Sequence, residues 1–506
     1  MTGARRNVLF IVLDQWRADA LGAAGNGRIL TPNLDRLAQA GTLFRNHFAQ
    51  ATPCGPARAA LLTGLYQHNN HVFRNGSPLD GAITNLAREA RTCGYDPVLF
   101  GYTDSTADPR GRHSADPALA TYEGVMPGFT PELVLVEDSL PWLAHLEESG
   151  CGFANLGEAL TPVEGDGPGS VFAARFQSRH SRTNFLTDAV LRFLSVRRCE
   201  QWFVHLCYIA PHPPFLAPPP FHALYRPEAM PRLSAAADAV GEARQHPLLA
   251  ALLERTRRAS FFAGEGSVAT LDEAAFAALR ATYYGMVSEV DEAIGRLVGR
   301  IEAWGLIEET LVIVTADHGE MLGDHWLLGK EGYFAEACHV PLIICLPGAA
   351  GGRHVEAFTE AVDVMPTILE WIGAQAVPRS DGHSLAGFCR GTPPVRWRQA
   401  AHWEADFREP GASSLGAALG LAPPECGFAV QRDARFHYVH FTALPPLLFD
   451  LARDPGCFTN LAGRPEYAVA ECRAAQAMLS WRMATTSGPL GHLLAKPGGL
   501  VDLFAG

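Results

Sequence analysis

Short, continuous apolar runs recur along the chain and predict buried strands. Residues 8–13 form such a run, rich in β-branched side chains, and it ends abruptly at Asp14-Gln15. This pattern is typical of a strand buried on both faces of a parallel sheet, with polar groups at its carboxyl end. Open α/β sheets place their functional sites at that end. Further runs that predict strands occupy residues 98–101, 202–207, 311–315 and 341–345.

Helical patterns lie between these strands. A helix opened by Thr31-Pro32 stops at Gly41, and residues 291–304 carry apolar side chains at helical spacing. Strands that alternate with helices predict an α/β fold, with a large, mostly parallel sheet sandwiched by helices.

The pattern changes near residue 380. A helix at residues 364–372, opened by Asp363, is followed by loop-rich sequence with strand-like pieces at residues 436–441 and 447–451. We therefore expect a large domain at residues 1–380 and a smaller α+β subdomain at residues 381–506. The second is expected to carry a small antiparallel sheet and a helix.

Composition narrows the function classes. The 506 residues include 41 Lys plus Arg and 53 Asp plus Glu, which gives a net charge of −12, so nucleic acid is not expected as a partner. An apolar share of 48% supports a real core and excludes disorder as the main state. No apolar run approaches the roughly 20 residues that cross a membrane. Arg5 and Arg6 precede only a short run without a cleavage site, so we expect a cytoplasmic protein without a membrane partner.

One cysteine stands apart from the rest. The 11 cysteines are scattered without Cys-x-x-Cys pairs, which fits reduced thiols better than a disulfide framework or a zinc site. Cys54 opens the segment Cys54-Gly55-Pro56-Ala57-Arg58. Pro56 favours the first turn of a helix, so Cys54 is expected at a helix N-terminus, with the Arg58 cation one turn on. The same residues would also fit a buried structural cysteine ahead of an ordinary helix.

The longer pattern Cys54-x-Pro56-x-Arg58-x-x-Leu61-x-Thr63-Gly64 resembles the signature of type I sulfatases, in the alkaline phosphatase superfamily. Within that family the chain is most similar to the phosphonate monoester hydrolase and arylsulfatase group. The similarity runs from residue 7 to about residue 482. Its motifs lie at residues 14–19, 54–58, 211–215, 323–330 and 438–446.

The resemblance implies an alkaline-phosphatase-like fold and a hydrolase of sulfate monoesters, phosphonate monoesters or phosphodiesters. In the family the cysteine is oxidised to formylglycine (3-oxoalanine), whose hydrate attacks sulfur or phosphorus, and the covalent intermediate then breaks by C–O cleavage. It also implies one divalent metal ion, with Mn or Ca favoured and Mg or Zn also open. The residues that would surround the ion are Asp14, Gln15, Asp317, His318 and the modified Cys54.

Either acidic pair alone would also fit a helix cap or a solvated loop acid. The resemblance further implies that Lys330 and His212 hold the substrate oxygens, with one of them helping to protonate the leaving oxygen. His212 lies in a proline-rich loop at residues 211–220. Arg58 would orient the modified Cys54. The remaining substrate-pocket residues would be Asn75, Tyr102 and Thr103.

The implied partners are a small ester substrate, a formylglycine-generating maturation enzyme, and further copies of the chain in a dimer or tetramer.

Two positions depart from the family pattern. Asp104 replaces a hydroxyl residue and would repel an anionic substrate. His339 replaces an arginine, which affects a structural ion pair.

Three alternatives stay open at this stage. A choline-sulfatase-like specificity would need an aromatic and carboxylate cage for a quaternary ammonium group, to which Phe73, Trp16 or Trp326 could contribute. A metal-binding scaffold would keep Cys54 as a thiol. A phosphate-transferring enzyme with a serine or threonine nucleophile is disfavoured by the cysteine after Pro53.

Overall fold

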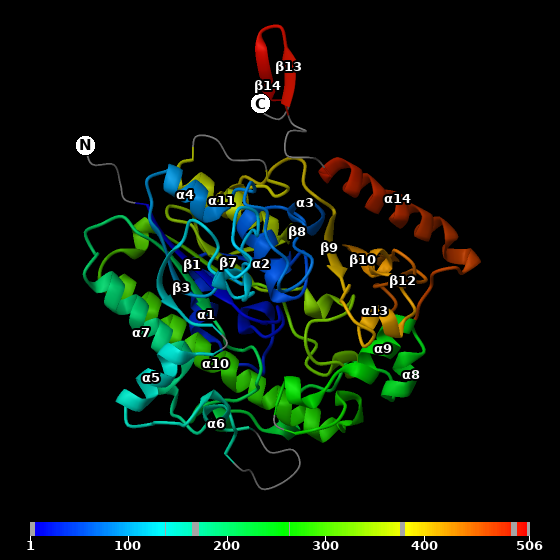
Figure 1. The fold of residues 1–506 in the computed structure, drawn as a ribbon, viewed down its shortest axis with the longest axis horizontal. Helices are drawn as coiled ribbons and strands as arrows, with labels where there is room; N and C mark the ends of the chain where they lie inside the picture. Colours follow the sequence, from blue (N-terminus) through cyan, green and yellow to red (C-terminus); the bar gives the residue numbers. More distant parts are fainter. Residues whose placement is uncertain are drawn as a thin grey trace.

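A computed structural model describes residues 6–136, 138–163, 172–262, 264–374, 380–486 and 493–502. Its centre is an eight-stranded sheet in the order β4-β3-β5-β1-β6-β7-β2-β8 (Figure 1). All neighbouring strands are parallel except that β7 is antiparallel to both β6 and β2. The strand bounds are β1 Asn7–Leu13, β2 Thr42–Phe48, β3 Pro97–Gly101, β4 Thr130–Val134, β5 Phe203–Tyr208, β6 Thr310–Ala316, β7 Leu342–Cys345 and β8 Arg353–Glu360. The five strands predicted from apolar runs are β1, β3, β5, β6 and β7.

The middle of the sheet positions the candidate residues. β1 lies between β5 and β6 and is parallel to both. Leu13 lies opposite Ala316 in the register of β1 with β6, so Asp14 and Asp317 leave the sheet at the same level. Every residue of β1 and β6 is buried, as continuous apolar runs predict. The carboxyl ends of these two strands therefore bring the predicted ligand pairs together.

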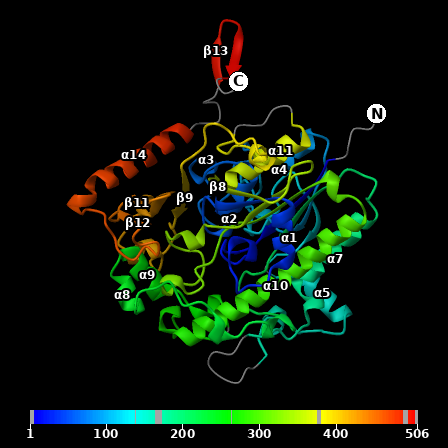
Figure 2. The same ribbon diagram turned by 180° about the vertical axis from the view of Figure 1, so that it is seen from behind.

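Helices cover both faces of the sheet (Figures 1 and 2). One layer contains α10 with α1 and α7 packed against it, and the other contains α2, α4 and α11. Their bounds are α1 Pro32–Ala40, α2 Cys54–Thr63, α4 Leu86–Thr92, α7 Arg182–Ser195, α10 Glu273–Ala303 and α11 Val364–Ile372. The remaining helices are α3 Gln67–Asn70, α5 Leu140–Glu148, α6 Leu156–Ala159, α8 Ala239–Ala243, α9 Pro247–Arg255, α12 Ala386–Arg390, α13 Leu415–Ala418 and α14 Ala468–Thr485. None of the helices in the described ranges is both long enough and apolar enough to span a bilayer.

Two helices differ from their prediction. The helix predicted at residues 291–304 is the last part of α10, which has 31 residues. Nearly all side chains from Ala278 to Asp291 are buried, so this half lacks the polar face that makes a helix visible in sequence. Thr31 precedes α1 as predicted, but its side chain does not cap the helix. The Thr31 hydroxyl instead accepts a hydrogen bond from the Gly22 amide at 2.8 Å.

The predicted small antiparallel sheet is present after residue 380. Its order is β12-β11-β10-β9, and α14 packs against β10 and β11. The bounds are β9 Ala400–Asp406, β10 Gly427–Asp433, β11 Phe436–Phe441 and β12 Leu447–Asp450. Trp403, Val430 and Phe449 belong to the same hydrophobic cluster as β1, so the two sheets share a core. The division of the chain at residue 380 stays a prediction. A hairpin of β13 (Leu493–Lys496) and β14 (Gly499–Asp502) stands apart from the body in both views (Figures 1 and 2).

Candidate active site

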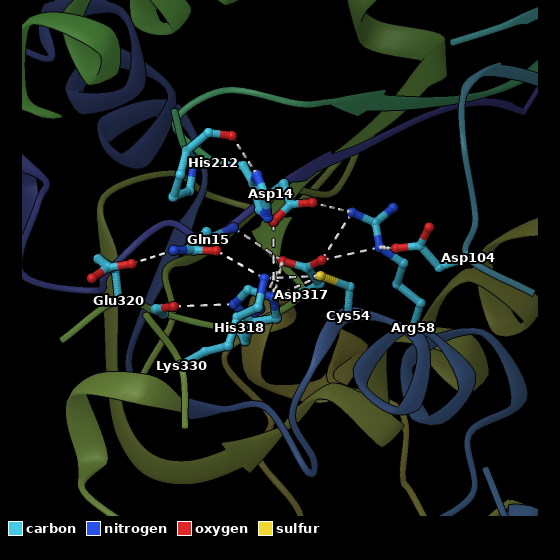
Figure 3. Close-up of polar contacts among 12 residues, drawn as sticks. Asp14, Gln15, Cys54, Arg58, Asp104, His212, Asp317, His318, Glu320 and Lys330 are labelled. Carbon is cyan, nitrogen blue, oxygen red and sulfur yellow. Dashed lines mark hydrogen bonds and ion pairs between the residues drawn. The ribbon is translucent and has the colours of Figure 1, made fainter. Parts of the chain in front are cut away.

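The predicted cysteine and metal ligands converge at the carboxyl end of the central strands (Figure 3). Asp14 follows β1, Asp317 and His318 follow β6, and Cys54 is the first residue of α2. One ligand atom from each of these four residues lies within 4.8 Å of the others, and all four residues are buried. Cys54 Sγ lies 3.2 Å from His318 Nε2. Three separate segments of the chain therefore build one compact centre.

Gln15 is held at this centre by Asp317 and by Glu320, a residue to which the sequence analysis assigned no role. The backbone of Gln15 is in the left-handed region, with φ of 66°, and its amide donates to Asp317 Oδ1 at 3.1 Å. The side-chain NH₂ of Gln15 donates to Glu320. Because a carboxylate only accepts hydrogen bonds, this contact turns Gln15 Oε1 toward Lys330, whose Nζ donates to it at 2.9 Å.

Glu320 also fixes the loop that carries Lys330. Its Oε1 accepts hydrogen bonds from the Leu322 amide at 2.9 Å and from the Gly329 amide at 2.6 Å. Burial raises the pKa of Glu320 to about 7, although these hydrogen bonds oppose the shift. Lys330 Nζ lies 3.1 Å from Cys54 Sγ. One buried carboxylate thus positions two predicted site residues. Its place two residues after His318 was the only sequence signal for it.

Arg58 contacts the carboxylates on one side of the centre (Figure 3). Its guanidinium contacts Asp317 Oδ2 at 2.8 Å, Asp14 Oδ2 at 3.1 Å and Asp104 Oδ2 at 3.3 Å. It also donates to Cys207 Sγ at 2.8 Å, and it lies 4.1 Å from the centre of the Tyr102 ring. Arg58 therefore acts on the carboxylates around Cys54. Cys207, at the end of β5, is a further neighbour that sequence reasoning did not single out.

The two central carboxylates differ in their electrostatic setting. Burial, reinforced by the charge of Asp317, raises the pKa of Asp14. Burial also opposes ionisation of Asp317, but His318, Arg58 and Lys330 outweigh it and lower its pKa to about 2. Asp14 Oδ1 is buried and has no hydrogen-bond partner within the described ranges. An unpartnered carboxylate oxygen beside a second carboxylate and an imidazole fits the needs of a hard divalent cation.

Asp104 pairs with Arg58 instead of facing a substrate unopposed. Burial raises the pKa of its carboxyl to about 7, with Arg58 acting against the shift and Asp14 and Asp317 adding to it. The other departure, His339, lies away from the centre. Its Nε2 donates to the Arg45 carbonyl at 2.8 Å, and its ring stacks on Phe48 at 4.7 Å.

The predicted pocket residues fall into two groups. Asn75 and His212 line a cavity of about 560 Å³ together with Gln15 and Lys330. Asn75 Oδ1 accepts from the Gly55 amide at 2.8 Å, which ties the cavity wall to the start of α2. His212 donates from Nδ1 to the Pro213 carbonyl at 2.7 Å, and burial lowers its pKa to about 3.

Tyr102 and Thr103 are buried and are not among the residues that line this cavity. The Tyr102 hydroxyl donates to Asp14 Oδ2. The Thr103 hydroxyl donates to the Gly124 carbonyl at 3.0 Å and accepts from the Met126 amide at 2.7 Å, so it holds a loop together.

None of the aromatic residues considered for a choline cage is among the described residues that line this cavity. Trp16 is fully buried and donates to the Ala20 carbonyl. Trp326 packs against Phe276, and the Phe73 ring lies under the Arg408 guanidinium.

A mostly parallel sheet sandwiched by helices, with a cysteine at a buried helix start among acidic and imidazole groups, defines a hydrolase of the alkaline phosphatase superfamily. Residues 6–374 match the Sulfatase family, and residues 323–483 match the C-terminal family of N-sulphoglucosamine sulphohydrolase. The chain therefore belongs to the sulfatase family.

Three relatives show which members of the family the chain is similar to. The multifunctional alkaline phosphatase superfamily protein PehA of Trinickia caryophylli is 42% identical, with 98% of this chain and 99% of the relative covered. The choline-sulfatase of Rhizobium meliloti is 27% identical over 92% of this chain and 84% of the relative. The structure of the phosphonate monoester hydrolase of Agrobacterium radiobacter superposes with a TM-score of 0.96 at 43% identity, covering 98% of this chain and 99% of that chain.

Proposed function

We propose that this chain hydrolyses sulfate monoesters and phosphonate monoesters, and phosphodiesters as a related activity, through a formylglycine made from Cys54. The observation that carries the proposal is the convergence of Cys54 Sγ with ligand atoms of Asp14, Asp317 and His318 within 4.8 Å. A nucleophile built on Cys54 would lie where a cation and Lys330 can both reach the same substrate oxygens.

We propose one divalent cation at this centre, held by Asp14, Gln15, Asp317, His318 and the modified Cys54. The unpartnered Asp14 Oδ1 and the oxygen-rich donor set support it and favour Mn or Ca over a softer ion, with Mg and Zn as further candidates. When bound, such a cation withdraws charge from the substrate oxygens and favours deprotonation of the attacking hydroxyl.

The chain's own residues would do the rest of the work. Lys330 has three N–H groups, and within the described ranges Gln15 and Cys54 use two of them, so one stays available for a substrate oxygen. Its charge would stabilise the negative charge that grows in the transition state. Arg58 would keep Asp14 and Asp317 in place and balance their charges. His212 faces the same cavity from the opposite loop and would contact the leaving oxygen.

The test is peptide mass spectrometry across Cys54, on protein made in its own host or beside a maturation enzyme. Conversion of Cys to formylglycine lowers the peptide mass by about 18 Da. Cys207 is a matched internal control, because it is also buried and also lies next to Arg58. We expect the mass loss at Cys54 and not at Cys207, together with hydrolysis of aryl sulfates and aryl phosphonates. A matured protein in which Cys54 remains a thiol would overturn the mechanism.

The remaining expectations belong to this proposal as well. They are a dependence on a formylglycine-generating enzyme, assembly into a dimer or tetramer, and a cytoplasmic location. Size-exclusion chromatography with light scattering would give the number of subunits directly.

A further inference from the structure

The cavity extends well beyond the residues proposed for hydrolysis. Its volume of about 560 Å³ leaves room for an organic group larger than the sulfate or phosphonate itself. The outer part is formed by α9 and the segment after it, by the end of β9 and the segment after it, and by the start of β10, which all lie at one flank of the molecule (Figure 1). Leu252, Phe261 and Phe428 give this part an apolar wall.

Charged residues surround this outer part. Four arginines and three carboxylates line it: Arg74, Arg255, Arg257, Arg408, Asp406, Glu331 and Glu409. The balance is therefore positive, although the whole chain has a net charge of −12. Lys330, deeper in the same cavity, adds a further positive charge. A local excess of this kind attracts anionic groups.

Three of these arginines are already engaged by the protein. Arg74 pairs with Glu409 at 2.8 Å. Arg408 pairs with Asp406, and Arg255 donates to the Ser413 carbonyl.

Arg257 differs from the other three. It is exposed, it lines the cavity, and its guanidinium has no hydrogen bond or ion pair with any residue in the described ranges. A free guanidinium presents a planar pair of N–H donors that matches a carboxylate in two parallel hydrogen bonds.

We infer that the organic group of the preferred ester carries a carboxylate at its far end and that Arg257 binds it. The inference rests on the proposed function, because the reacting end of the ester must lie against Lys330 and Cys54. The apolar wall then covers the middle of the organic group. The substrate class is an amphiphilic ester with one negative charge at each end.

The same cavity could instead bind an ester whose organic group is cationic. Glu331 is also exposed at the cavity, and its charge would favour a quaternary ammonium group. Arg257 would repel such a group, and four arginines outnumber the carboxylates. The experiment therefore includes a cationic ester.

The probes are three aryl sulfates that share one ring: carboxyphenyl, carbamoylphenyl and trimethylammoniophenyl sulfate, each as the para and the meta isomer. The carboxamide is neutral, nearly the same size as the carboxylate, and more electron-withdrawing. Leaving-group chemistry alone therefore favours the carboxamide. A higher kcat/KM for a carboxylate must come from recognition of its charge.

We expect kcat/KM for at least one carboxylate isomer to exceed that of its carboxamide by about fivefold to tenfold, as suits one partly exposed charged hydrogen-bond pair. Arg257→Gln should abolish this ratio, and higher salt should reduce it. Arg192→Gln is the matched control: Arg192 is an exposed arginine of α7 outside the cavity lining, so the variant changes the net charge equally. Its ratio should equal that of the parent.

The outcomes distinguish a failure of the carboxylate inference from a failure of the proposed function. An enzyme that hydrolyses the esters without preferring a carboxylate, or with the ratio intact in Arg257→Gln, overturns the inference and leaves the proposed function standing. The trimethylammonio group is the most electron-withdrawing of the three, so leaving-group chemistry alone favours the cationic ester. A preference for that ester that is lost in Glu331→Gln overturns the inference in favour of Glu331. A matured protein that hydrolyses none of the esters overturns the proposed function and the inference together.

Discussion

Replacing Asp104 by asparagine should stabilise the metal-free protein, and the gain should grow with pH. Asp104 is a third carboxylate on Arg58, beside Asp14 and Asp317. Burial and these neighbours make its ionised form costly. An asparagine of the same shape keeps a polar group near Arg58 without adding the third negative charge.

The size of the effect follows from the two pKa values. The pKa of the Asp104 carboxyl is near 3.8 in the unfolded chain, whereas burial raises it to about 7 in the folded chain. Between these values the folded state binds more protons than the unfolded state, so stability falls as pH rises. The two pKa values differ by about 3, and each pH unit between them changes the free energy of unfolding by roughly 1.4 kcal/mol. Above pH 7, ionised Asp104 therefore lowers the free energy of unfolding by no more than about 4 kcal/mol.

The measurement is the free energy of unfolding in urea, for the parent and Asp104→Asn, with a chelator present, from pH 4 to pH 8. The difference between the two proteins should shift in favour of the variant by several kcal/mol across this range. Asp188→Asn is the control, because Asp188 pairs with Arg296 on the surface and contributes less than about 1 kcal/mol at any pH. A difference for Asp104→Asn that is the same at pH 4 and pH 8 would refute the reasoning.

Three further predictions concern the centre itself. Asp317→Asn removes a charged ligand, so metal content measured by elemental analysis should fall with activity, and a full metal load would remove Asp317 from the ligand set. Lys330→Met should lower kcat by about 100-fold or more, because it removes a charged donor beside the nucleophile, and near-normal kcat would exclude that role. Glu320→Gln, whose own amide can turn an NH₂ group toward Gln15, should lower kcat or metal affinity by about tenfold while the thermal midpoint stays near that of the parent. A loss of stability without a loss of rate would make Glu320 merely structural.

The proximity of Asp14 and Asp317 could be predicted from the sequence, because the ends of the two buried strands before them are visible as the ends of apolar runs. The apolar runs before Asp14 and before Asp317 stop abruptly, and neighbouring parallel strands bring such ends to one edge. Pro56 likewise located the start of α2 at Cys54. These features depend on local sequence, which a single chain displays.

Other features depend on contacts between distant segments and left no local trace. A buried apolar run is the same for a parallel and an antiparallel neighbour, so the direction of β7 could not be predicted. The contact of Glu320 with Gln15 joins residues 305 positions apart. Arg257 reaches the cavity only because the segment after α9 folds back against the segment after β9.

Helix α2 is buried along all ten of its residues, and Cys54 itself is only 5% exposed. A maturation enzyme that must bind the peptide around Cys54 has access to it before α2 packs into the protein and not afterwards. The proposed maturation of Cys54 and the folding of α2 therefore compete in time. A culture in which synthesis outpaces maturation would accumulate two populations with the same fold, converted and unconverted at Cys54, and specific activity would report their proportion.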